Sequence, residues 1–315
     1  MSESHQLLTT SLSLAGNTFG WILAGLAARR LGVLPLSLVN RISRISFNTI
    51  LPLLLFSGAT QLDIGQRDNF TYLWAGAIAT LLNVVLVWQY AKWRGIPRAY
   101  QGIFVQGAYR ANLAIIGISL CTSAYGEKGL VLASLAIALW TTLFNILAVI
   151  VLSRTLEEHQ SPLSTMAGIL RNPLIIAIAA GTALALSPLQ SPPVVITAGK
   201  FISAYFLPLI LLCIGAAMDL SALRNSGALV WQATFWRLVI APAICLTCAL
   251  LMGVQGMELG VLFLLMAAPV AAASFVMVVA ARGDGACAAN ILMLSTLLSA
   301  ISVPAGFALL TWLSL

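Results

Sequence analysis

The sequence predicts an all-α membrane protein with ten transmembrane helices, built as two five-helix repeats of opposite orientation. Three observations predict this fold class: the composition, a series of ten apolar stretches, and an internal match at about half the chain length. Of the 315 residues, 60% are hydrophobic and only 8% are charged. A soluble domain carries about a quarter of charged residues, so this chain lacks the polar groups that would cover a soluble surface.

Apolar stretches of membrane-spanning length follow one another along the whole chain. Crossing the hydrocarbon takes roughly 20 apolar residues, and Gly, Pro and charged residues mark where each stretch ends. The predicted spans are residues 8–28, 45–63, 70–91, 99–122, 130–152, 169–187, 199–219, 228–252, 257–281 and 286–313. The longest connection, 154–166, lies at the midpoint and separates a first repeat (1–157) from a second (158–315).

Basic residues in the connecting loops predict the orientation, because cytoplasmic loops carry an excess of Lys and Arg. One side holds Arg29, Arg30, Arg41, Arg44, Lys92, Arg94, Arg98, Arg154, Arg171, Arg224 and Arg282; the other holds Arg67, Lys128 and Lys200. Both termini are therefore predicted outside the cell inner membrane. The net charge of +7 would suggest a nucleic-acid partner only for a soluble protein, so for this membrane chain we expect contact with membrane lipid and no nucleic-acid partner.

An internal repeat sets the expected symmetry. At an offset of 156, Pro52 falls on Pro208, and at 157, Asn112 falls on Pro269. Because five is odd, the second copy must enter the membrane from the opposite side. Transporters with such inverted repeats alternate access by moving one bundle against another around a central site. Channels can share the symmetry, but ten helices favour a carrier.

The fourth and ninth spans carry the most unusual sequence. Pro269 removes an amide donor and should break or kink the ninth span. Half-helix N-termini that meet at mid-membrane carry partial positive charge and suit an anion. Arg110 costs at least ~2.5 kcal/mol near the bilayer centre and is expected to organise the crossing or attract an anionic substrate. The alternatives are a packed kink at Pro269, an Asn112 that bonds across helices, and a structural Arg237.

The candidate residues fall into two groups. The candidate substrate-binding residues are Asn112, Arg110, Ala111, Ala268, Pro269, Val270, Ser274, Ser57 and Gly215. Neutral oxygens that could serve an ion or proton belong to Asn83, Thr141, Thr142, Asn145, Ser295, Thr296 and Ser299, although mid-helix Ser and Thr usually bond to their own helix. Spans 3–5 and 8–10 hold no internal Asp or Glu, which favours uniport or proton coupling over an acidic sodium site.

Several short motifs carry a family resemblance. They are Ile50–Phe56 in the second span, Arg110-x-Asn112-x-Ala114-x-x-Gly117 in the fourth, Arg171-Asn172-Pro173 in the sixth, Leu212–Ala216 in the seventh and Ala268-Pro269 in the ninth. In order and spacing they resemble the auxin efflux carrier family of permeases, which shares its fold with the bile acid:sodium symporters. The resemblance covers essentially the whole chain.

The resemblance implies a scaffold of helices 1, 2, 6 and 7 and a transport bundle of helices 3–5 and 8–10, with helices 4 and 9 discontinuous and crossing. It also implies a small organic anion as substrate, such as a carboxylate or an auxin-like acid, and an Asn112 that faces it. The residues that follow Pro269 are more apolar than a dicarboxylate site would be, since Ser274 is the nearest polar side chain after Pro269. A monoanion is therefore expected. A sodium-coupled organic anion symporter of the bile acid type is the closest alternative.

Other function classes lack their residues. Both histidines, His5 and His159, lie outside the predicted spans, and the sequence has no H-E-x-x-H motif. We therefore expect no enzyme, no metal site and no cofactor. The C-x-x-C of Cys245 and Cys248 is expected to be apolar packing. A ligand-responsive receptor, the direction of transport, the coupling ion and a homodimeric assembly are left open.

Overall fold

The structure is a computed structural model that describes residues 19–45, 49–60, 70–156, 173–187, 192–217 and 227–313. Within these ranges the regular structure is helical, apart from one isolated β-bridge. Residues 157–166 of the predicted connection between the halves lie outside the described residues, as do Arg171 and the span-end residues Asp63 and Asp219.

The first half of the chain contains a helix over residues 19–30 followed by named elements. These are α2 (Leu36–Ile45), α3 (Leu51–Ala59), α4 (Thr71–Trp93), α5 (Arg98–Tyr109), the π-helical turn η2 (Leu113–Gly117) and α6 (Ile118–Leu156). Gly126 divides α6 into two arms, because its φ of 59° and ψ of −138° suit only a residue without a Cβ. The first arm completes the predicted fourth span, and the second arm contains the predicted fifth.

The connection between the first two predicted spans contains a short helix. α2 lies there and packs against α10, where Val39 is buried with Cys213 and Ala216. Ile42 follows Val39 at a helical spacing of three and packs on the same cluster. This short apolar face stabilises a helix that is too short to be read as a span.

The second half contains ten named segments. They are α8 (Pro173–Leu186), α9 (Pro193–Phe201), η3 (Ile202–Phe206), α10 (Leu207–Ala217), α11 (Ala228–Phe235), η5 (Trp236–Ile240), α12 (Ala241–Leu251), α13 (Gly256–Ala267), α14 (Ala272–Ala280) and α15 (Gly285–Trp312). The π-helical turns η3 and η5 join their neighbours into continuous runs. α13 and α14 are separate helices, although the sequence places them in a single span.

Helices of membrane-spanning length are present. Among the described residues, five runs are long and apolar enough to cross a membrane: Thr71–Trp93, Leu113–Leu156, Pro193–Ala216, Ala228–Leu251 and Gly285–Trp312. α4 exposes a row of large apolar side chains, including Trp74, Ile78 and Val85. Such a surface is stable against lipid and costly against water. The arrangement of ten spans stays a prediction.

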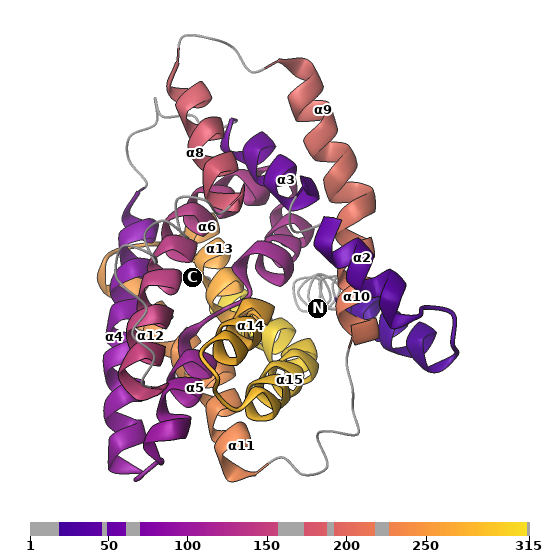
Figure 1. The fold of residues 1–315 in the computed structure, drawn as a ribbon. Helices are drawn as coiled ribbons and strands as arrows, with labels where there is room; N and C mark the ends of the chain where they lie inside the picture. The colour runs from indigo at the N-terminus through magenta and orange to yellow at the C-terminus, as the bar shows by residue number, and fades with distance from the viewer. Residues whose placement is uncertain are drawn as a thin grey trace.

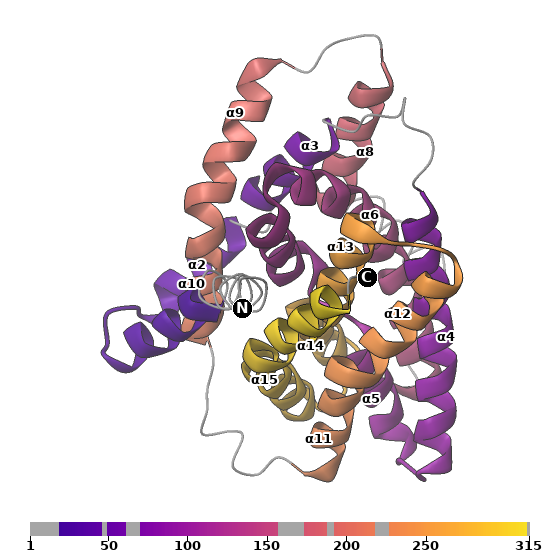
Figure 2. The ribbon, with the colours of Figure 1, turned by 180° about the vertical axis from the view of Figure 1, so that it is seen from behind.

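The helices pack as two neighbouring groups that meet at α6. In Figures 1 and 2, α4, α5, α11 and α12 lie at one edge of the molecule, and α9 and α10 form a long rod at the other, with α2 beside it. α3 packs on α8 and α9, whereas α4 packs on α5 and α12. The broken helices α5 and α13 both pack against α6, so the helix breaks lie inside the molecule.

Two polar contacts show which charged residues lie near each end of the second arm of α6. Arg98 donates a 3.2 Å hydrogen bond to the carbonyl of Arg154. Lys200 forms a 2.8 Å ion pair with Glu127, next to the turn at Gly126. Because the second arm of α6 runs from this turn to Leu156, these contacts lie at opposite ends of one helix. Arg98 and Arg154 therefore lie at the end of this helix opposite Lys200, while the distribution of the other loop charges and the direction of insertion stay predictions.

Candidate functional site

The first half of the site is the interruption of α5. The helix ends at Tyr109, and Arg110 (φ −85°, ψ 97°) and Asn112 (φ −81°, ψ 73°) leave helical geometry before η2 begins at Leu113. The N–H of Gly117 donates a 2.8 Å bond to the Asn112 carbonyl, five residues back, so the restart is π-helical. π-Turns inside helices are frequent at functional sites.

The second half of the site is the interruption between α13 and α14. A proline has no N–H and disfavours helical backbone in the residue before it. Ala268 accordingly has a φ of −55° and a ψ of 146°, and the chain returns to a helix only at Ala272. The break lies at Pro269, where the sequence predicts it.

The two interruptions cross and bond to each other. The Asn112 N–H donates to the Pro269 carbonyl at 2.7 Å, and the Ala271 N–H donates to the Arg110 carbonyl at 3.1 Å. These bonds form an antiparallel β-bridge between Ala111 and Val270. Non-helical backbone at membrane depth needs such partners, because lipid offers none. We call these two bridging segments, residues 110–112 and 269–271, the crossing.

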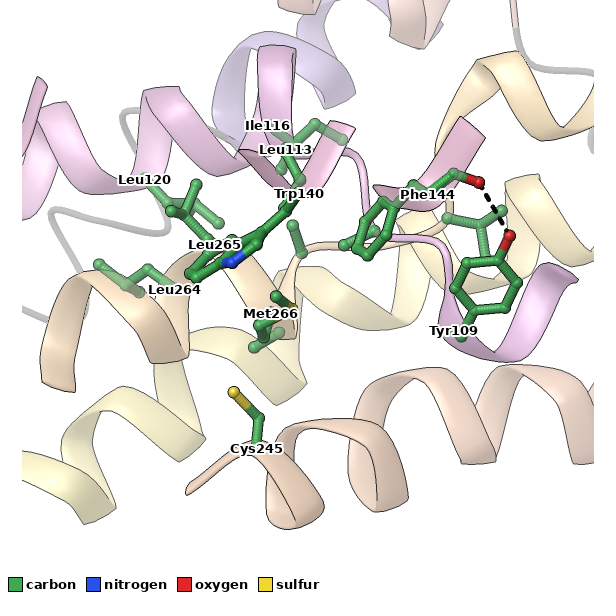
Figure 3. Close-up of a cluster of buried hydrophobic side chains, with 14 of the residues drawn as sticks. Tyr109, Leu113, Ile116, Leu120, Trp140, Phe144, Cys245, Leu264, Leu265 and Met266 are labelled. Carbon is green, nitrogen blue, oxygen red and sulfur yellow. Dashed lines mark hydrogen bonds between the residues drawn. The ribbon is translucent and has the colours of Figure 1, made fainter. Parts of the chain in front are cut away.

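Side chains from the surrounding helices complete the crossing. The Val270 N–H donates to the Ser295 hydroxyl of α15 at 3.2 Å. Figure 3 shows Leu113 and Ile116 of η2 beside Trp140 of α6 and Leu265 of α13. All of these side chains are buried. The crossing is thus a rigid polar core inside an apolar shell.

The buried guanidinium of Arg110 reaches side chains of α6 and α14. Its Nη2 donates to Asn145 Oδ1 of α6 at 2.6 Å, and its Nη1 contacts Met277 Sδ of α14 at 3.0 Å. The residue is 5% exposed. Both partners are neutral, so the guanidinium keeps an uncompensated positive charge next to the crossing.

Two polar side chains at the crossing, of Ser274 and Asn112, could bond to a bound molecule. The Ser274 hydroxyl is buried, and among the described residues it has no hydrogen-bond partner. The Asn112 carboxamide provides no cap for η2 and is 5% exposed. A buried polar group without a partner is costly, so a bound molecule that bonded to these groups would be favoured.

Comparison with known proteins identifies the family of the chain that contains the crossing. Residues 17–305 match the family of membrane transport proteins, the auxin efflux carriers. The chain belongs to this family. It is also similar to an uncharacterized transporter of Methanothermobacter thermautotrophicus, at 22% identity over 284 residues that cover 90% of this chain and 93% of the relative. The resemblance found in the sequence is confirmed. Members of such a transporter family generally have no enzymatic activity.

Two candidate binding residues of this membrane transport protein lie in helix packing. Ser57 of α3 donates to the Val195 carbonyl of α9 at 3.0 Å. A Cβ on Gly215 would lie 1.7 Å from the carbonyl oxygen of Ile22, so this glycine lets α10 approach the helix over residues 19–30. Ala111, Ala268 and Val270 are buried and contribute to the crossing through their backbone.

The candidate coupling residues of the transporter are scattered. Asn145 accepts a hydrogen bond from Arg110, and the Ser295 hydroxyl accepts one from the Val270 N–H. Asn83 accepts a 2.6 Å hydrogen bond from the Trp236 indole. The hydroxyls of Thr296 and Ser299 bond to their own helix at Leu292 and Thr296. Thr141 and Thr142 are partly exposed on α6. Asn145 and Ser295 thus both bond to the crossing, and the coupling role of the seven residues stays a prediction.

The structure adds two residues that the candidate set omits. Met277 supports Arg110, and nothing in the sequence singles out this methionine. Arg237 of η5 donates from Nη1 and Nη2 to the carbonyls of Tyr109 and Met266. The sequence signal for Arg237 is a charge within a predicted span, which is compatible with a structural role.

Proposed function

We propose that this transporter moves a small organic anion, such as a carboxylate or an auxin-like acid, across the cell inner membrane by alternating access. The carrying observation is the positive charge of Arg110, whose described partners Asn145 and Met277 are neutral. An unpaired buried charge is strongly unfavourable. An anion that enters beside the crossing supplies the missing counter-charge.

The distribution of carboxylates supports an anion over a cation. The acidic residues of the described chain are Glu127, Glu258 and Asp284, and each lies in a turn or at a helix start. Within those ranges none lies beside the crossing. η2 and α14 both begin there, so their N-terminal partial positive charges add to that of Arg110.

Side chains around the crossing support a small acid with an apolar body. The Asn112 carboxamide and the Ser274 hydroxyl are the polar groups available to hydrogen-bond a carboxylate. Their neighbours in α14 are alanines, of which Ala272 is exposed. One charge fits this surface better than two, because a second carboxylate would lack a cationic partner.

The transport movement that we propose uses two bodies. The predicted spans 3–5 and 8–10 form the moving bundle, and the predicted spans 1, 2, 6 and 7 form the scaffold. The spans are arranged as two inverted repeats, residues 1–157 and 158–315. η2 packs against α10, which brings the crossing to the boundary of these bodies. The ion pair of Lys200 with Glu127 joins them at one end, so that it would break when that end opens.

Ligand-induced thermal stabilisation of the purified protein tests this proposal. We expect a monocarboxylate from a screened series to raise the melting temperature, and its neutral amide to have no effect. Arg110→Ala should weaken carboxylate binding about tenfold or more, a change of ~1.4 kcal/mol. Arg94→Ala, which removes an exposed charge at the end of α4, is the control and should bind like the wild type.

The alternative, a sodium-coupled symporter, predicts a different result in proteoliposomes. Carboxylate uptake should be equal with and without a sodium gradient if the proposal holds. Uptake that requires the gradient would favour the symporter. Equal stabilisation by the acid and its amide, or unchanged binding in Arg110→Ala, would contradict an anion site.

A further inference from the structure

Arg237 is a charged residue that is almost completely buried. It lies in η5, between α11 and α12, and is 1% exposed. Its two terminal nitrogens donate to the main-chain carbonyls of Tyr109 and Met266. Tyr109 is the last residue of α5, and Met266 is in the last turn of α13. A single guanidinium therefore joins the C-terminal ends of both broken helices.

A positive charge at the position of the Arg237 guanidinium stabilises the C-terminal ends of α5 and α13. The last carbonyls of a helix have no partner within it, and a helix C-terminus carries about half a negative charge. Two such ends meet here at membrane depth, where neither lipid nor bulk water can neutralise them. Carbonyl oxygens that converge in this manner are also the groups with which channels bind dehydrated monovalent cations.

The space beside the guanidinium has the composition of a small cation site. A cavity of about 10 Å³ borders Arg237 and is lined by Thr80, Asn83, Tyr109 and Met266, together with Ala79, Ala241 and Cys245. That volume is about one water-sized sphere. The Nε of Arg237 is buried and has no hydrogen-bond partner among the described residues. Oxygen-bearing and apolar residues thus line the cavity together, and the Arg237 guanidinium lies at its border.

The two carbonyls that Arg237 joins also match in the repeat register. An offset of 157, which aligns Asn112 with Pro269, aligns Tyr109 with Met266. Arginine suits a position between two equivalent acceptors, because its planar fork presents donors in two directions and its charge is permanent. One side chain can therefore serve both helix ends.

We propose that Arg237 is a built-in cation of the transporter, occupying the position that a free monovalent cation would otherwise take at the crossing. Removal of the guanidinium converts this position into a binding site for Na⁺ or a similar ion. The wild-type protein keeps both helix ends neutralised in every salt. Only the consequence, that transport needs no such ion, rests on the proposed function; the cation site itself is independent of the substrate.

Thermal unfolding of the purified full chain tests the inference in NaCl, KCl and choline chloride at equal ionic strength. The wild type should melt within about 1 °C in all three salts, because no ion binds at Arg237. Arg237→Ala should melt at least about 5 °C lower in choline chloride. Na⁺ or K⁺ should then restore at least half of this loss with saturable concentration dependence. Arg110→Ala is the matched control, since its guanidinium contacts no helix end, and it should gain no dependence on the cation.

A second pair of variants decides the matter if Arg237→Ala does not fold in any salt. Arg237→Lys keeps the charge and should melt at a clearly higher temperature than Arg237→Met, which keeps the bulk alone. A folded Arg237→Ala that melts at the same temperature in all three salts would overturn the inference. So would equal melting temperatures for the Lys and Met variants. Neither readout involves substrate, so a failure here is distinct from a failure of the anion proposal.

Discussion

The main-chain N–H of Asn112 donates a 2.7 Å hydrogen bond to the carbonyl oxygen of Pro269. The repeat register pairs the same two residues at an offset of 157. Each helix break frees backbone groups that lipid cannot bond, and here the two breaks bond to each other. The crossing is therefore stable as a pair, and neither break is expected to persist without the other.

The proline of the crossing gives the first prediction. Pro269→Ala supplies an N–H and lets residue 268 become helical, so that α13 and α14 can join. We expect the substrate-induced thermal shift to disappear while the variant remains folded. Pro304→Ala is the control, because Pro304 lies within the continuous helix α15. A normal ligand shift in Pro269→Ala would show that the break is dispensable.

The hydroxyl of Ser295 gives the second prediction. Ser295→Ala leaves the Val270 N–H without its acceptor, and a buried unpaired donor costs about 1–3 kcal/mol. The melting temperature should fall by several degrees. Ser299→Ala is the matched control, because that hydroxyl bonds only to the carbonyl of Thr296 in its own helix. Similar losses in the two variants would contradict a specific role for Ser295.

The sequence predicts the breaks better than it predicts the surroundings. Pro269 has a strong local signal, and Asn112 was found through the repeat, so both positions could be identified without coordinates. Ser57 and Gly215 lie in helix contacts, and their role in binding stays a prediction, since a small residue in a membrane helix fits a helix contact as well as a binding site. The direction of the Arg110 side chain depends on Asn145 and Met277, which are distant in sequence. The helix α2 was missed because its apolar face is short.

The partner of Arg110 gives the third prediction. Asn145→Asp keeps the shape of the side chain but places a carboxylate 2.6 Å from Nη2 of Arg110. The new charge neutralises Arg110 and competes with an anionic substrate. The unliganded protein should melt at an equal or higher temperature, while carboxylate affinity falls about tenfold or more. Isothermal titration measures both the acid and its neutral amide. Unchanged affinity for the acid would show that Arg110 does not attract the substrate.

The contact at Gly215 gives the fourth prediction. Gly215→Ala would place a Cβ 1.7 Å from the Ile22 carbonyl oxygen, which forces α10 away from the helix over residues 19–30. The melting temperature should fall by several degrees, because overpacking typically costs ~1–3 kcal/mol. Gly20→Ala is the control, as nothing lies within 4 Å of its Cβ position. If both variants melt like the wild type, this helix contact is not as close as the structure has it.

The central claim is that two broken helices cross beside an unpaired arginine and hold an anion there. A density map of the protein with its best carboxylate ligand is the most direct measurement. We expect α5 to end at Tyr109 and α13 at Ala267, with ligand density next to Asn112 and the first turn of α14. Continuous helices through residues 98–125 and 256–280, or a ligand bound elsewhere, would contradict it.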